Sequence, residues 1–337
     1  MSTATGPGDS IRVVLGGDVM LGRLVKEEIL ARGPRYPLGP VAEFMRGADL
    51  TVVNLECAIT SRETVWEGAS KAFYFGAPPG AVESLADAGV DLVSLANNHS
   101  LDFGRRGLLD TLDGLRERGI AAAGAGRTLD DAEAPAVVER RGVRFGMAAF
   151  CDHQADFAAR ADAPGIAFLD LLDERAACRR FQERLDRMRA LGVEWPILSV
   201  HWGPNMVRRP SSRFVRLARA AIDMGYASVF GHSAHVFQGI ELYKGRPIFY
   251  SVGDLVDDYA VDPDFENDRQ LLFEVSLTGL AVREVALYPV VIDQCRTDWA
   301  AGAAFDRIAE RATGLSAEMG TTVTRDGNRL VATVSGG

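Results

Sequence analysis

Short apolar runs, each followed by a polar or glycine-containing turn, recur along the first two thirds of the chain. The runs cover residues 11–15, 50–53, 90–94, 195–200 and 227–230, and β-branched residues are frequent in them. This pattern is typical of strands buried in a parallel sheet. Helical patterns lie between the runs, at residues 24–31, 79–88, 105–118, 169–191 and 212–224. Because strands that alternate with helices form parallel sheets, the chain is predicted to have an α/β fold.

Each of these strands ends in side chains of a type that binds metals or moves protons. The strand ends supply Asp18, Glu56, Asn98 with His99, His201, and His232 with His235. Four of the five histidines of the chain are in this set. The carboxyl ends of parallel strands meet at one edge of a sheet, where ligands and catalytic groups collect. We therefore expect these side chains to lie close together.

Two residues have a plain structural interpretation beside the functional one. Asp18 follows directly on a strand and precedes a helical pattern, which is a frequent position for a helix N-cap. His153 is a lone histidine in a polar segment, so a surface or loop histidine is the favoured interpretation.

The donor set suggests a class of chemistry. Carboxylate, amide and imidazole donors suit divalent Mn, Fe or Zn, and the absence of thiolates argues against a structural zinc site. The candidate ligands are Asp18, Glu56, Asn98, His201, His232 and His235. They exceed the needs of one tetrahedral ion and would suit two neighbouring ions that share a carboxylate, as in two-metal hydrolases. The chain has no GxSxG elbow, no P-loop, and no GxGxxG after the first strand.

Composition excludes other classes. The chain has 337 residues and a formal net charge of −9, which argues against a nucleic-acid-binding surface. An anionic substrate would then need a locally positive site, such as bound cations. The four cysteines are far apart and include no CxxC pair, a usage that fits a reducing cytoplasm. Residues 1–10 lack the features of a signal peptide and are predicted to be disordered, and no apolar run is long enough to span a membrane. The protein is predicted to be soluble and cytoplasmic.

The last third of the chain is mainly β. Hairpins are predicted at residues 239–251, 269–291 and 321–334, with a helix at 299–313. Without an internal repeat or a linker, residues 11–295 are predicted to form one domain, with the helix and hairpin of 296–337 packed on it. A polar loop at residues 60–80 contains an aromatic cluster, which is expected either to bind substrate beside the site or to pack locally.

Several of these motifs resemble those of the CapA family, the poly-γ-glutamate synthesis proteins. They lie in order at residues 17–23 (GDVMLGR), 54–56 (NLE), 95–99 (LANNH), 201–203 (HWG), 231–236 (GHSAHV) and 250–254 (YSVGD). The resemblance covers residues 12–255. It implies an α/β fold similar to that of calcineurin-like metallophosphoesterases. In this fold, an αββα sandwich, two β-sheets are flanked by helices and the site lies at the strand ends.

The resemblance also implies roles for the residues that match the motifs. The metal ligands would be Asp18, Glu56, Asn98, His201, His232 and His235, with Glu56 as the bridging carboxylate. His99 would be the general acid that protonates the leaving group, and Asp102 would orient it. Arg23 would bind the substrate anion. Apart from the resemblance, the hypothesis for Trp202, which follows His201, is that it helps to shape the pocket.

The chain departs from the metallophosphoesterase pattern at several motif positions. Met20 occupies the position of a first-motif histidine, Glu56 replaces a shorter aspartate, and two residues rather than one separate His232 from His235. Asp254 stands where the family more often has asparagine, and it is expected to adjust the charge of the substrate site or to cap a turn. With Met20 in place of a ligand, tight binding of two metals is in question.

The favoured hypothesis is a divalent-metal-dependent hydrolase acting on a small anionic phosphoester or amide, for example a γ-glutamyl-like substrate. A non-catalytic accessory protein of poly-γ-glutamate or capsule synthesis is the first alternative. A tailoring enzyme that forms or cleaves amides in a small-molecule pathway is the second. The intact ligand positions and His99 favour the hydrolase, and neither nucleic acid nor a membrane is an expected partner. The sequence gives no indication of oligomeric state.

Overall fold

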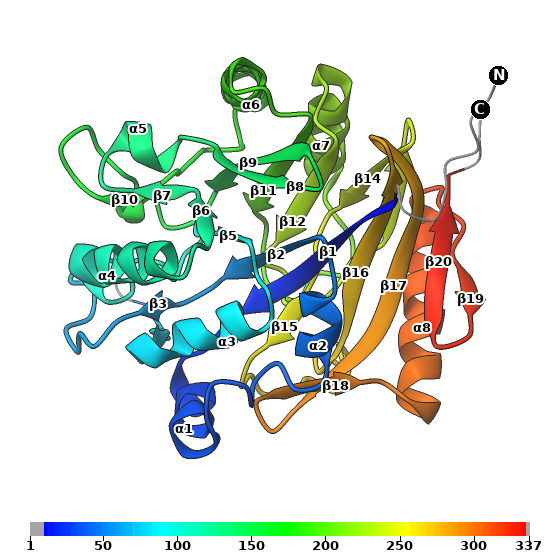
Figure 1. Cartoon of the computed structure of the whole chain (residues 1–337), viewed down its shortest axis with the longest axis horizontal. Helices are drawn as coiled ribbons and strands as arrows, with labels where there is room; N and C mark the ends of the chain where they lie inside the picture. The colour runs from blue at the N-terminus through cyan, green and yellow to red at the C-terminus, as the bar shows by residue number, and fades with distance from the viewer. Residues whose placement is uncertain (1–9, 70, 335–337) are drawn as a thin grey trace.

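Two large β-sheets lie face to face with helices on their outer sides, as the computed structural model shows for residues 10–69 and 71–334 (Figure 1). Apolar side chains of both sheets form one continuous core between them. The predicted α/β fold, a sandwich of two sheets between layers of helices, is confirmed. Of the stretch predicted to be disordered, residues 1–9 lie outside the described residues, and Ser10 begins the first strand.

The first sheet is mixed and is built around β1. Its strand order is β19-β20-β17-β16-β1-β2-β5-β6, with β15 paired to β1 and β18 paired to β17. Strand β1 pairs in parallel with β2 and antiparallel with β16, so it joins a parallel half to an antiparallel half. The bounds are β1 (Ser10–Val19), β2 (Leu50–Leu55), β5 (Leu92–Ser94), β6 (Ala121–Ala123), β15 (Asp254–Val256), β16 (Arg269–Thr278), β17 (Ala281–Asp293), β18 (Arg296–Trp299), β19 (Thr324–Asp326) and β20 (Arg329–Thr333).

The second sheet has the order β13-β14-β12-β11-β9-β8. Its strands are β8 (Ala136–Arg140), β9 (Val143–Cys151), β11 (Trp195–His201), β12 (Ser228–His232), β13 (Ile240–Tyr243) and β14 (Arg246–Phe249). Along β11, Trp195 and Ile197 belong to the core between the sheets, whereas Leu198 and Val200 pack under the outer helices. This alternation follows from the two-residue period of a strand and explains why β11 is apolar on both faces.

The helices form the two outer layers. Helices α6 (Glu174–Ala190) and α7 (Ser212–Met224) cover the second sheet, and α2 (Val41–Arg46), α3 (Val82–Asp87) and α4 (Gly104–Glu117) lie on the side of the first (Figure 1). Helix α8 (Gly302–Glu318) packs on β16, β17 and β13 and so contacts both sheets. The remaining elements are α1 (Arg23–Arg32), α5 (Leu129–Ala132), the 3-10 helices η1 (Pro79–Ala81) and η2 (Ala155–Phe157), and the paired short strands β3 (Ala58–Ile59) with β4 (Gly76–Ala77) and β7 (Ala125–Gly126) with β10 (Gly165–Ile166).

Two helices begin later than the sequence predicts. Helix α6 starts at Glu174 rather than at residue 169, because the side chain of Asp173 caps it by accepting from the backbone N–H of Ala176. Helix α8 starts at Gly302 rather than at Trp299, because residues 296–299 pair with β17 as strand β18. In the part of the chain that the structure describes, no helix has the length and apolar character needed to cross a membrane.

Candidate metal centre and its cavity

The two sheets bring their strand ends together at one place. Asp18 lies near the end of β1, and Glu56 follows β2 directly. His201 and His232 end the neighbouring parallel strands β11 and β12 and are register partners. The backbone N–H of Ser233, just past β12, donates to Asp18 Oδ2 at 3.3 Å, which ties the end of the second sheet to the end of the first.

Within the described residues, the side chains form two overlapping groups that could hold a metal ion. One group contains Asp18, His201 and His232, and the other contains Asp18, Glu56, His235 and Asp254. In each group, one donor atom per residue lies within 4.8 Å of the others. Asp18 belongs to both groups, whereas Glu56, the predicted bridging carboxylate, belongs to only one of them. If two ions bind, Asp18 is therefore the carboxylate placed to serve both.

Several oxygen atoms at this place are buried without a hydrogen-bond partner among residues 10–69 and 71–334. They are both carboxylate oxygens of Glu56, Oδ2 of Asp254 and Oδ1 of Asn98. A buried carboxylate is costly unless it is paired or neutralised. Burial, reinforced by Asp254, raises the pKa of Asp18 to about 7, and burial raises the pKa of Glu56 well above its usual value. A divalent cation would satisfy these oxygens, so the carboxylates fit a metal site.

The imidazoles respond to burial in the opposite sense. Burial lowers the pKa of His232 to about 3 and holds the pKa of His201 well below its usual value, where the nearby His232 adds to the effect. Both rings are therefore neutral at physiological pH and offer lone pairs, which is the form that binds metals. The mixed oxygen and nitrogen donors suit Mn, Fe or Zn.

Hydrogen bonds fix the orientation of the donors. Asn54 Nδ2 donates to Asp18 Oδ1 at 2.8 Å, and Asn97 Nδ2 donates to Asn54 Oδ1 at 3.1 Å. His235 Nδ1 lies 2.9 Å from Asp254 Oδ1. The backbone of His235 is also unusual, with a φ of 56° in the left-handed region that non-glycine residues seldom adopt. Supporting contacts of this kind are typical of metal ligands, and strained residues cluster at functional sites.

His99 stands beside this centre as part of a buried dyad. Its Nδ1 lies 2.5 Å from Asp102 Oδ2, and its ring stacks on Phe75 with centroids 3.8 Å apart. Burial lowers the pKa of His99 to about 4. Lys71 Nζ lies 2.5 Å from Asp102 Oδ1, on the other side of the carboxylate. The predicted pair of His99 and Asp102 is thus joined by a lysine that the sequence analysis did not identify.

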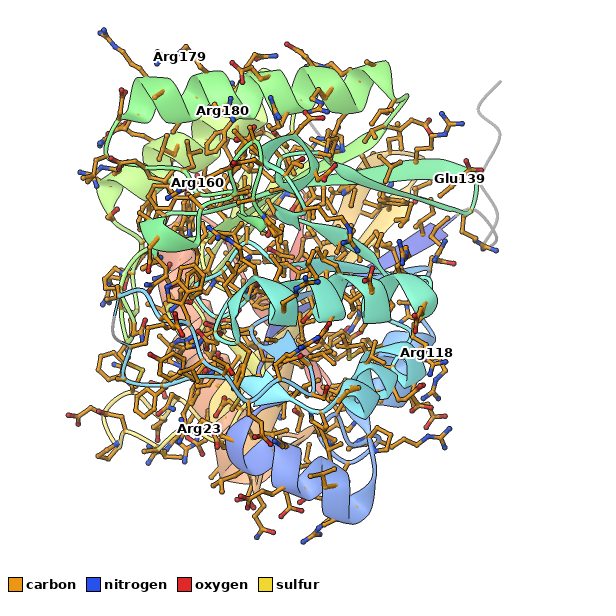
Figure 2. All side chains as sticks on the ribbon, turned by 90° about the vertical axis from the view of Figure 1, so that its left-hand side faces the viewer. Arg23, Arg118, Glu139, Arg160, Arg179 and Arg180 are labelled. Atoms are coloured by element: carbon orange, nitrogen blue, oxygen red, sulfur yellow. The ribbon has the colours of Figure 1, made fainter. Side chains whose placement is uncertain are left out.

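A cavity of about 330 Å³ opens beside the metal-binding groups. Its walls include Arg23, Phe73, Phe75, His99 and His235. Arg23 is the first residue of α1, and Figure 2 shows it on the face turned toward the viewer. Its guanidinium carbon lies 4.9 Å from the ring centroid of Phe73, and its Nε lies 3.3 Å from Asp258 Oδ2. Of the sequence predictions, the structure brings Arg23, Asn98 and His99 together around one hollow.

The comparisons with known proteins assign a family. The profile of the family described as "Bacterial capsule synthesis protein PGA_cap" matches residues 12–259. The chain belongs to this family. The predicted resemblance to CapA proteins is confirmed.

The relatives are spread over several bacteria. The chain is 32% identical over 315 residues to a "Probable polyglutamine synthesis accessory protein" of Mycobacterium tuberculosis, covering 80% of each chain. It is 28% identical over 252 residues to "Capsule biosynthesis protein CapA" of Bacillus anthracis, covering 74% of this chain and 60% of that protein. It is 29% identical over 250 residues to "PGA biosynthesis protein CapA" of Bacillus subtilis, covering 72% and 62%. The alignments thus span about three fifths of the length of the Bacillus relatives.

Trp202, Asp254 and Met20 lie differently from the other predicted positions. Trp202 is 3% exposed, stacks on Phe214 with centroids 4.6 Å apart, and donates from Nε1 to the carbonyl of Tyr250 at 2.8 Å. The structure therefore places it in the core beneath α7 and not in the wall of the cavity. Asp254, predicted at the substrate site, lies in the second metal-binding group. Met20 is fully buried, and its Sδ lies 3.1 Å from the backbone nitrogen of Gly22.

His153 lies closer to the centre than the sequence predicts. Its ring centroid is 5.7 Å from that of His201, and its Nδ1 is 2.5 Å from Asp152 Oδ1. His153 lies in a loop, as predicted, but β9 pairs in parallel with β11 and carries the residues of this loop to the same edge of the sheet as His201. The strand-end rule that identified His201 would have identified His153 had this pairing been recognised. For Lys71 the only signal was its position in the aromatic loop of residues 60–80.

Proposed function

We propose that this member of the family is a divalent-metal-dependent hydrolase of a small anionic phosphoester or amide, such as a γ-glutamyl amide. The names of its relatives support a role in capsule or poly-γ-glutamate synthesis. One observation carries the proposal: buried carboxylate oxygens that accept no hydrogen bond from any described residue face neutral imidazoles beside a cavity lined by His99.

The residues that would hold one or two ions of Mn, Fe or Zn are Asp18, Glu56, Asn98, His201, His232 and His235, with Asp254 in contact with His235. When bound, such a cation supplies Lewis-acid activation of water and of the scissile group. The protein's part is to fix the donors and to exclude bulk water, which the complete burial of Asp18, Glu56 and His232 achieves.

His99 would carry the proton. Because a carboxylate only accepts hydrogen bonds, the contact with Asp102 Oδ2 places the ring hydrogen on Nδ1 and leaves Nε2 free. The Nε2 of a neutral imidazole can accept a proton from the attacking water and then donate it to the leaving group. The low pKa of His99 supports this order, in which the ring first accepts a proton and only then acts as the predicted general acid.

The rim of the cavity would bind the substrate. Arg23 offers a guanidinium for a phosphate or carboxylate, and the rings of Phe73 and Phe75 enclose the apolar part of a small ligand. Together with bound cations, Arg23 would supply the positive field that an acidic chain otherwise lacks.

The test is hydrolysis by protein loaded separately with Mn, Fe and Zn. Two substrate sets are needed: p-nitrophenyl phosphate with its diester analogue, and γ-glutamyl p-nitroanilide with short γ-glutamyl peptides. We expect turnover of one set that stops with EDTA and returns with added metal. Fully loaded protein that hydrolyses neither set would overturn the proposal.

A second candidate is a non-catalytic accessory role in polymer synthesis. It is favoured by the words "accessory protein" in the name of the Mycobacterium tuberculosis relative, which aligns with 80% of this chain. The two functions differ in their dependence on His99. With the His99→Gln change, a hydrolase loses turnover and keeps its metal, whereas an accessory protein keeps its function in polymer synthesis.

A further inference from the structure

Lys71 is a buried lysine in the loop that borders the cavity. Its side chain is 8% exposed, and its Nζ lies 5.1 Å from the ring centroid of Phe157. Lysine is seldom buried this deeply unless its ammonium group is paired. Here it contacts the Oδ1 of Asp102 and the backbone carbonyl of Asn98, and it lies 3.3 Å from His99 Nδ1.

Asp102 is completely buried and is held from two sides. Oδ1 accepts from Lys71, while Oδ2 accepts from His99 Nδ1 and, at 2.7 Å, from the backbone N–H of Phe75. If Lys71 were removed, Oδ1 would lose its charged donor and the carboxylate could rotate toward the imidazole. The plane of the ring and the direction of its Nε2 depend on this arrangement.

The same segment of chain also forms the wall of the cavity. Phe75 stacks on the ring of His99, and Phe73 and Phe75 line the hollow together with Arg23. The contacts of Lys71 with Asp102 and Asn98 therefore anchor this segment at the point where the proton-transferring ring meets the substrate.

We propose that Lys71 is a positioning residue for the reaction. By binding Asp102 and the carbonyl of Asn98, it fixes the His99 ring with Nε2 unprotonated. The same contacts hold the aromatic wall of the cavity, Phe73 and Phe75, in place beside the ring. This inference rests on the proposed function. Lys71 meets Asn98 only at its backbone carbonyl and His99 only on the Nδ1 side of the ring, and it acts through His99 and Asp102.

The first experiment needs no turnover. Long-range ¹H–¹⁵N spectra resolve the two nitrogens of each imidazole, and the His99 signals are assigned by their loss in His99→Gln. We expect wild-type protein and the matched surface variant Lys26→Met to show one Nδ1–H form of His99. In Lys71→Met, we expect the His99 signals to shift or to average between tautomers. Unchanged His99 signals in Lys71→Met would overturn the proposal. If Lys71→Met does not fold, Lys71→Gln is measured in its place and read by the same criterion.

The second experiment uses any substrate that the loaded wild-type protein hydrolyses. We expect Lys71→Ala to lower kcat by about 10- to 100-fold, as for other residues that orient an active group, with little change in KM or metal content. Added propylamine, which replaces the missing ammonium, should restore part of kcat. A loss that appears only in KM, or one that propylamine does not relieve, counts against the proposal. If no substrate is hydrolysed, the proposed function fails while the spectra still decide the role of Lys71.

Discussion

The two sheets contribute different chemistry to the same centre. The first sheet ends in oxygen donors, Asp18, Glu56 and Asp254, whereas the second ends in the imidazoles of His201 and His232. Burial raises the pKa of the carboxyl groups and lowers that of the imidazoles, because it disfavours the charged form of each. Each metal-binding group joins Asp18 of the first sheet to histidines from the other side, either His201 and His232 at the strand ends or His235 in the loop that follows β12. The site therefore exists only where the sheets meet, and folding of the sandwich creates it.

The largest effect should come from the residue that both groups share. Asp18→Asn keeps the shape of the side chain but removes the charge, so we expect the protein to lose all bound metal. His201→Gln removes a donor from only one group and should leave part of the metal in place. Elemental analysis after gel filtration compares them, and equal losses would show that Asp18 is not shared.

The next effect concerns His99, which lies beside both groups without belonging to either. His99→Gln should lower kcat by about 10²- to 10⁴-fold, the usual contribution of a proton-transferring side chain. Metal content should not change, because the ring is held by Asp102 and Phe75. Steady-state kinetics with parallel metal analysis make the comparison. Undiminished kcat would remove His99 from the mechanism.

The buried carboxyl groups of the centre should make the free energy of unfolding depend on pH. Burial raises the pKa of Asp254 to about 8, so without metal the folded protein holds a proton that the unfolded chain releases near pH 4. Between these values the folded state binds more protons, and its free energy of unfolding falls as pH rises. We expect Asp254→Asn to be more stable than wild type at pH 8 in EDTA, by roughly 1–3 kcal/mol, and to show little gain at pH 4. Denaturant unfolding at the two pH values measures this, and a gain that is equal at both would contradict it.

The smallest effect on the metal centre should come from Trp202, which follows His201 in sequence but packs in the helical layer. Trp202→Phe keeps the stacking on Phe214 and loses the hydrogen bond to the carbonyl of Tyr250. We expect a loss of about 1–3 kcal/mol in the free energy of unfolding, with metal content and KM unchanged. A change in KM without a loss of stability would return Trp202 to the substrate site.

The part of the site that lies at the ends of parallel strands could be predicted from the sequence. Asp18, Glu56, His201 and His232 follow apolar runs, and the geometry of parallel sheets brings such ends together. Asp254 was harder to place, because its short strand pairs with β1 only in the folded sheet.

The side of the sheet on which a side chain packs, and the pairing of strands that are distant in the sequence, could not be predicted in this way. His153 follows β9, which reads as one arm of a hairpin with β8, and its parallel pairing with β11 depends on the order of strands in the sheet. Lys71 lies in a loop without periodicity, so its contact with Asp102 is fixed by tertiary packing alone. Trp202 adjoins a candidate ligand, but sequence adjacency does not decide on which side of the sheet a ring packs.

X-ray absorption at the metal edge of Mn- or Zn-loaded protein, with the metal content measured on the same sample, tests the joint contribution of the two sheets most directly. We predict a coordination shell of oxygen and imidazole scatterers at one or two equivalents of metal. The imidazole signal should fall in His201→Gln, and all bound metal should be lost in Asp18→Asn. A shell of oxygen alone, or metal held equally well by Asp18→Asn, would contradict a centre built from both sheets.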